Sequence, residues 1–168
     1  MPLGDDTLSF RARALAQAHP LSPAAKSLID RISREEAESQ PLPEFGPWAA
    51  SAMLAGYCLR TVEEDRAGHD ASGAVSVDAA SLDALDSSAD GVAEALRNGD
   101  EATVVLADVD EVITTLDGLI ASEIERRVDP WREEVGADSW RMFEDYIAHW
   151  TVKGYAIRTA EPTVAADR

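Results

Sequence analysis

The stretch that decides the fold spans residues 47–66 and reads PWAASAMLAGYCLRTVEEDR. Wound as an α-helix, it carries apolar side chains on one complete face and on most of the remaining surface. Because a helix that is apolar nearly all round is buried among other elements, we expect it to be the central helix of a larger core. Ala52 and Gly56, four residues apart, would let another helix approach closely. The main apolar face consists of Trp48, Ala52, Ala55, Leu59 and Val62, and Met53, Leu54, Tyr57 and Cys58 extend it.

Sequence patterns typical of helices also lie on both sides of this stretch. A first helix is expected from about Leu8 to His19, where Pro20 stops it. A second opens with Ser22 as N-cap and Pro23 at its first position, and it fades by Gln40. The last helix begins near residue 138 and carries a broad aromatic face, whereas residues 159–168 lack a pattern and are expected to fray. The apolar face of the second helix is Ala25, Leu28, Ile29 and Ile32, and that of the last includes Trp140, Phe143, Tyr146, Ile147, Trp150, Gly154 and Ile157.

Residues 78–128 predict an antiparallel αα-hairpin. Apolar residues in the first half follow spacings of three and four, which is a heptad-like seam. Asn98-Gly99 then breaks the helix, and Asp100 can cap the next one. A turn this short forces the two helices to run antiparallel. The first seam is Leu82, Leu85, Ala89, Val92 and Leu96, and the second stripe is Val105, Val109, Val112, Ile113, Leu116, Leu119, Ile120 and Ile124.

Together these patterns predict an all-α bundle of about five long helices, since no segment shows convincing strand alternation. With 168 residues the chain suits one domain, and the loop at residues 67–77 is where an internal boundary would fall. No apolar run is long enough for a transmembrane helix, and the first residues lack the features of a signal peptide. Cys58 is the single cysteine, which excludes an intramolecular disulfide and favours a reducing, cytoplasmic location. We expect its thiol to be a buried apolar filler.

The chain is strongly acidic, with 15 Lys and Arg against 32 Asp and Glu and a formal charge of -17. Nucleic-acid backbones and anionic membrane surfaces repel such a protein, so neither is an expected partner. The charge is uneven, because residues 71–129 hold 3 basic and 14 acidic residues, a net of -11. The hairpin should therefore have an apolar inner side and an acidic outer side.

Two interpretations of the acidic side stay open. It is either a solvated face that keeps the protein soluble or a binding surface for a basic protein partner, supported by the near absence of Lys and Arg in this part of the sequence. The second interpretation predicts a non-catalytic interaction module, such as an adaptor, regulator or inhibitor. The sequence does not decide whether the chain forms a homodimer. The predicted partner-binding residues are Asp83, Asp86, Asp90, Glu94, Asp110, Glu111 and Asp117.

The first alternative function is a metal-dependent hydrolase. Helical bundles can hold divalent metals on inward carboxylates, and the candidates here are Glu63, Asp108 and Glu111. The Glu-x-x-His pair typical of such sites is missing from the sequence. We therefore favour the interpretation that these acids are solvated carboxylates at helix ends. The same interpretation applies to Glu64, which follows Glu63. No cofactor is predicted.

The second alternative is a bundle that binds a small ligand in an aromatic pocket. Its candidate lining is Trp140, Phe143 and Trp150, with Glu123 as a polar group. The same aromatic face would serve equally as core, and Glu123 is favoured as the partner of Arg127 in an ion pair one turn later. His149 lies one turn after Asp145, and the preferred interpretation is a surface ion pair between them.

Overall fold

The computed structural model describes residues 20–41, 45–67, 75–98, 141–142 and 145–165. The elements are α2 (Pro23–Ser39), α3 (Phe45–Ala67), α4 (Ala79–Arg97) and a helix at residues 145–165, here named the C-terminal helix. Every element in these ranges is helical, which confirms the predicted all-α class. Within them, no helix has the length and apolarity that crossing a membrane requires. The predicted helix near residues 8–19 and the second helix of the hairpin lie outside the described residues.

The helix α2 begins and ends where the sequence predicts. Its N-cap Ser22 accepts a hydrogen bond from the backbone N–H of Ala25 at 3.1 Å, and Pro23 occupies the first turn. Gln40 is the C-cap. One face of α2 is buried against the rest of the molecule, and it comprises Ala24, Ala25, Leu28, Ile29 and Ile32.

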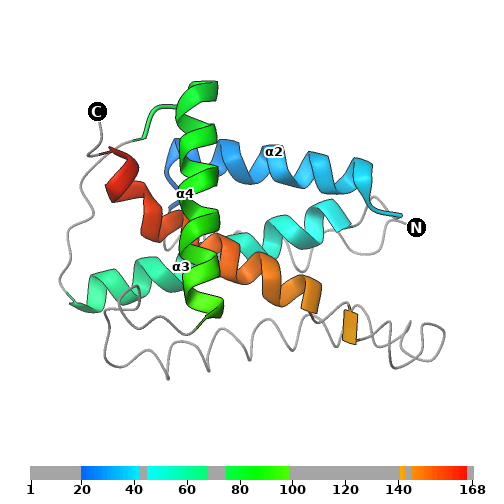
Figure 1. Cartoon of the computed structure of the whole chain (residues 1–168). Coiled ribbons are helices and arrows are strands. Elements are labelled where there is room, and N and C mark those ends of the chain that lie inside the picture. Colours follow the sequence, from blue (N-terminus) through cyan, green and yellow to red (C-terminus); the bar gives the residue numbers. More distant parts are fainter. Residues whose placement is uncertain (1–19, 42–44, 68–74, 99–140, 143–144, 166–168) are drawn as a thin grey trace.

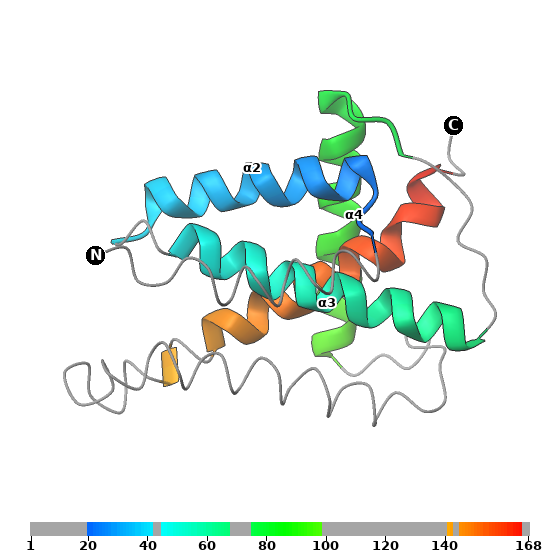
Figure 2. The same cartoon turned by 180° about the vertical axis from the view of Figure 1, so that it is seen from behind.

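The central position predicted for α3 is confirmed. Its neighbours include α2 and the C-terminal helix, and the latter crosses it in both views (Figures 1 and 2). The crossing is very close, because Gly56 lies against the backbone of Thr151 and Gly154 lies against the backbone of Met53. Gly56 therefore permits the close approach that its small size predicts. The buried residues of α3 include Ala49, Ala52, Met53, Ala55, Tyr57, Cys58 and Leu59.

The helix α4 runs across the other helices on one side of the molecule (Figure 1). Its N-cap Asp78 accepts from the backbone N–H of Ser81 at 2.8 Å, and Asn98 ends it as predicted. The buried seam is Leu82, Leu85, Ala89 and Ala93, while Val92 packs partly buried against the core. The apolar spacing thus predicted this seam correctly apart from its last members.

The C-terminal helix extends further than its sequence pattern suggests. It continues to residue 165, so the prediction of fraying from residue 159 is wrong for residues 159–165. Ala160 is 1% exposed and Glu161 is 2% exposed. The apolar spacing of the sequence does not reveal this last turn, because polar contacts as well as apolar ones hold it in place.

Candidate functional site

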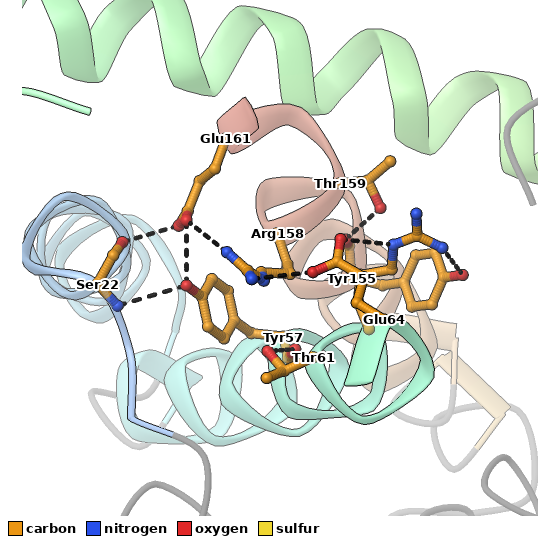
Figure 3. A network of polar contacts seen from close by, with 9 residues as sticks. Ser22, Tyr57, Thr61, Glu64, Tyr155, Arg158, Thr159 and Glu161 are labelled. Carbon is orange, nitrogen blue, oxygen red and sulfur yellow. Dashed lines mark hydrogen bonds and ion pairs between the residues drawn. The ribbon is translucent and has the colours of Figure 1, made fainter. Parts of the chain in front are cut away.

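A buried polar network joins three helices where the start of α2, the second half of α3 and the end of the C-terminal helix meet (Figure 3). Each member donates to or accepts from a residue of another helix or of the next turn. The network is dominated by carboxylates, guanidinium groups and phenols. Its members are Ser22, Tyr57, Arg60, Glu64, Tyr155, Arg158 and Glu161.

Glu161 is the centre of the first half of this network. Its carboxylate accepts from the hydroxyl of Ser22 at 2.8 Å, from the hydroxyl of Tyr57 at 3.2 Å and from Nη1 of Arg158 at 3.2 Å. Burial raises the pKa of Glu161 above its usual value, although these three donors oppose the shift. Burial, reinforced by the neighbouring Glu161 carboxylate, also raises the pKa of Tyr57.

Glu64 occupies the second half and lies between two guanidinium groups. Nε of Arg60 donates to it at 3.2 Å, and Nη2 of Arg158 pairs with it at 2.9 Å. Arg60 also donates to the hydroxyl of Tyr155 at 3.2 Å and lies over that ring, 5.5 Å from its centroid. The expectation that Glu64 is a solvated residue at a helix end is wrong, because it is 4% exposed and paired on both sides.

This network balances its own charges. The two carboxylates of Glu64 and Glu161 face the two guanidinium groups of Arg60 and Arg158. Because a buried charge is tolerated when it is paired and hydrogen-bonded, the arrangement is well suited to fixing the C-terminal helix against α2 and α3. Carboxylates already engaged with internal donors are poorly suited to act as metal ligands or general bases.

A second set of charges, here named the α4 ion cluster, holds α4 to its neighbours. It consists of Arg31, Asp83, Asp86, Asp90 and Lys153. Lys153 on the C-terminal helix is 4% exposed, and its ammonium group contacts the carboxylates of Asp86 and Asp90. Arg31 on α2 pairs with Asp83 at 2.9 Å and with Asp86 at 3.5 Å.

The α4 ion cluster contains three of the predicted partner-binding residues. Asp83, Asp86 and Asp90 are compensated by cations that come from α2 and the C-terminal helix, so the scarcity of Lys and Arg near them in the sequence does not make them unpaired. The side chains of Asp83 and Asp90 are nevertheless 71% and 68% exposed, and Glu94 is exposed as well. Asp110, Glu111 and Asp117 lie outside the described residues.

The metal-site candidates are not brought together in the described part of the chain. Asp108, Glu111 and the side chain of Glu63 lie outside it. Among the side chains that are described, no group of three or more His, Cys, Asp or Glu is arranged to hold a metal ion.

Of the predicted ligand-pocket residues, Trp150 is described, whereas Trp140, Phe143 and Glu123 are not. Trp150 packs against the core and meets the ring of Tyr146 edge-on at 6.2 Å. Tyr146 in turn meets Phe45 at 5.0 Å, and its hydroxyl donates to Glu36 at 2.6 Å. Within the described residues, Trp150 and Tyr146 thus pack against other protein groups.

His149 has a different neighbour from the predicted one. Its Nδ1 lies 2.9 Å from Nη2 of Arg97, at the end of α4, and no contact with Asp145 is seen among the described side chains. Burial, and then the cations Arg97 and Lys153, lower the pKa of His149. The neutral ring can accept from Arg97, and this contact adds a further link between α4 and the C-terminal helix.

Comparison with known proteins gives no assignment. The chain matches no protein-family model, and neither the curated proteins nor the solved structures contain a significant match. Function must therefore be inferred from the geometry of the described residues.

Both polar clusters escaped prediction from the sequence. Their partners are separated by long stretches of chain, such as Ser22 and Glu161 or Arg31 and Asp83. The one local signal is the i,i+4 pair formed by Arg60 and Glu64, which is a favourable spacing on a helix. That spacing alone does not distinguish a buried pair from a surface pair.

Proposed function

We propose that this protein is a non-catalytic helical interaction module that binds a basic protein partner through the outward side of α4. An adaptor, a regulator or an inhibitor would all work in this way. The observation that carries the proposal is that Asp83 and Asp90 are both ion-paired and exposed to solvent. Both are held in place by cations of the protein, yet they remain 71% and 68% exposed.

The carboxylates of Asp83 and Asp90 are preorganised for binding a partner. Arg31 and Lys153 restrict their positions before a partner arrives, which lowers the ordering cost of association. Asp83 and Asp90 are seven residues apart, so they lie on the same side of α4 at about 10 Å spacing. Glu94 extends this acidic row by one turn. A row of negative charge steers a basic partner and accelerates encounter.

The internal pairing of the buried ions also favours a binding role over a catalytic one. In the described ranges, the buried charged residues Arg60, Glu64, Lys153 and Glu161 each lie against an opposite charge. A catalytic acid or base must be within reach of its substrate, whereas these side chains are almost fully buried and contact other side chains of the protein. These networks support a rigid scaffold that presents α4.

We further propose that the module acts in the cytoplasm. Cys58 is the single cysteine of the sequence and is fully buried, and burial raises the pKa of its thiol to about 11. A buried thiol of this kind is unreactive, and a sequence with a single cysteine, which has no intramolecular disulfide, suits a reducing compartment.

The test is capture of partners by purified protein at low and at high salt, with variants that alter the acidic row alone. In the D83N/E94Q variant the row loses charge while the contacts of Lys153 are kept. The matched control is E35Q/E38Q, which removes two exposed carboxylates from α2. We expect a basic protein that is retained by the parent and by the control, lost by D83N/E94Q and released by salt.

A purified candidate then allows the affinity to be measured directly. The dissociation constant should rise at least tenfold in D83N/E94Q, and it should rise steeply with ionic strength for the parent protein. The proposal is wrong if every captured partner binds D83N/E94Q as tightly as it binds the control, or if binding is insensitive to salt.

A further inference from the structure

Arg97 is the single basic residue of α4, and it contacts the C-terminal helix instead of the acidic row. Its Nη2 atom lies 2.9 Å from Nδ1 of His149. Glu94, the last carboxylate of the row, precedes Arg97 by three residues, a spacing at which opposite charges on a helix can pair. Among the described side chains, however, Glu94 and Arg97 form no ion pair. The guanidinium group is therefore held by a ring on another helix and leaves the charge of Glu94 uncovered.

The contact between Arg97 and His149 requires a neutral imidazole. A neutral ring has one nitrogen that accepts a hydrogen bond, so Nδ1 accepts from Arg97 and the ring proton is on Nε2. The ring also meets that of Trp150 edge-on at 4.8 Å, which restricts its position. A protonated imidazole donates from both nitrogens, and a guanidinium group can only donate. Protonation therefore removes the hydrogen bond and leaves two cations facing each other.

The surroundings of His149 keep its ring neutral near pH 7. Burial, and then the two cations nearby, lower the pKa of the ring, whereas two carboxylates act in the opposite direction. His149 as a whole is exposed, so protons from solvent reach it. Mildly acidic conditions are then sufficient to charge it. The charged groups that face the ring are Arg97 and Asp90 from α4, Glu36 from α2 and Lys153 from its own helix.

Protonation of His149 should weaken the acidic row in two ways. Arg97 is exposed, so its side chain is free to move once the ring repels it, and Glu94 is the carboxylate one turn earlier on the same helix. Pairing between them would partly neutralise the last charge of the row. The imidazolium itself adds a positive charge near Asp90. Both changes make the potential of the row less negative.

We infer that His149 is a pH-sensitive switch that holds Arg97 away from the acidic row while its ring is neutral and releases it to Glu94 when the ring is protonated. The switch itself is a property of the chain alone. Its regulatory consequence rests on the proposed function, since it makes binding of a basic partner weaker in mildly acidic conditions.

The first experiment follows side-chain resonances of the full-length protein by NMR from about pH 5 to pH 8. In the parent, the Nε resonance of Arg97 should move with the same midpoint as the ring of His149. The carboxyl carbon of Glu94 should show a step at that midpoint in addition to its own titration. H149Q places an amide oxygen that accepts from Arg97 at every pH, so both changes should disappear. The matched control H69Q removes another histidine of the sequence and should retain them.

R97M provides an independent measurement on the ring. Without the neighbouring cation and its hydrogen bond to the neutral form, the pKa of His149 should be higher than in the parent. The switch is refuted if the resonances of Arg97 and Glu94 do not follow the midpoint of His149, or if they change in the same way in H149Q. A pKa of His149 that is unchanged or lower in R97M refutes it as well.

The second experiment tests the regulatory consequence with an oligolysine peptide, whose side chains stay charged over this range. Between neutral pH and about pH 5.5, the dissociation constant of the parent should rise about threefold more than that of H149Q, which is the effect of one exposed ion pair. Equal pH dependence in the two proteins would overturn the regulatory part while the resonances still decide the switch. Absence of binding at every pH would count against the proposed function and the regulatory part together.

Discussion

Gly56 and Gly154 bring the backbones of α3 and the C-terminal helix into direct contact. A Cβ atom built on Gly56 would lie 1.9 Å from the carbonyl oxygen of Thr151, and one on Gly154 would lie 1.8 Å from that of Met53. The obstacle in both cases is main chain, which has no rotamer to change. The two helices must therefore move apart to accept any side chain at either position.

The first prediction is that G154A lowers the free energy of unfolding by about 3 kcal/mol, because overpacking usually costs about 1–3 kcal/mol and main chain is the most rigid obstacle. Urea denaturation followed by circular dichroism measures the change. The control is G91A on the exposed side of α4, where a Cβ meets nothing within 4 Å. That variant should stabilise the protein by about 0.5–1 kcal/mol, because alanine favours a helix interior. Equal effects of the two substitutions would contradict this account.

The second prediction compares two N-caps. S22A removes the cap of α2 and also the hydroxyl that donates to the buried Glu161, whereas D78A removes the cap of α4 and an exposed contact with the Ser76 hydroxyl. A lost cap costs about 1 kcal/mol. A lost hydrogen bond to a charged group adds about 1.5–3 kcal/mol. We therefore expect S22A to be clearly more destabilising than D78A in thermal or urea unfolding, and similar values would show that the Ser22–Glu161 contact contributes little.

The third prediction concerns pH and Glu161. Burial raises the pKa of Glu161 in the folded state above the value of 4.5 expected for the unfolded chain. Between these two pKa values the folded state binds the additional proton, so the contribution of this group to stability increases as the pH falls. Relative to E161Q, the parent should gain stability as the pH is lowered from 7 towards 4.5. Unfolding free energies of both proteins across this range measure the effect, and a difference that is constant with pH would disprove it.

The fourth prediction is an asymmetry around Lys153. D86N/D90N leaves the buried ammonium group without its two carboxylates and should cost about 3–5 kcal/mol of unfolding free energy. K153M leaves carboxylates that are partly or largely exposed, and it should change stability by about 1 kcal/mol or less in either direction. Denaturant unfolding of the two variants is a direct comparison. A larger loss in K153M than in D86N/D90N would contradict the assignment of Lys153 as the buried charge.

The local features of the fold could be predicted from the sequence because they depend on neighbouring residues. Ser22-Pro23 marked the start of α2, Asn98 marked the end of α4, and the apolar character of residues 47–66 indicated a central helix. The close approach at Gly56 followed from residue size, although the helix that approaches could not be named. These predictions rest on capping chemistry, periodicity and side-chain volume.

The polar contacts could not be predicted, since they depend on tertiary structure. Asp86 and Asp90 have no basic residue nearby in the sequence, and their partner Lys153 is more than sixty positions away. Glu161 follows the last recognisable apolar stripe, so it looks like part of a polar tail until α2 and α3 are placed around it. Periodicity shows which face of a helix is apolar, but it does not show which charges meet across an interface.

The position of the C-terminal helix has a consequence for how the chain folds during synthesis. This helix supplies Gly154 to α3, Lys153 to α4, and Glu161 to the start of α2. All three contacts join residues that are far apart in the sequence, and none can form before the ribosome has released residues 153–161. The core therefore closes late, and α2–α4 remain incompletely covered until then. A truncation before residue 145 should accordingly abolish cooperative folding of the whole unit instead of removing one peripheral helix.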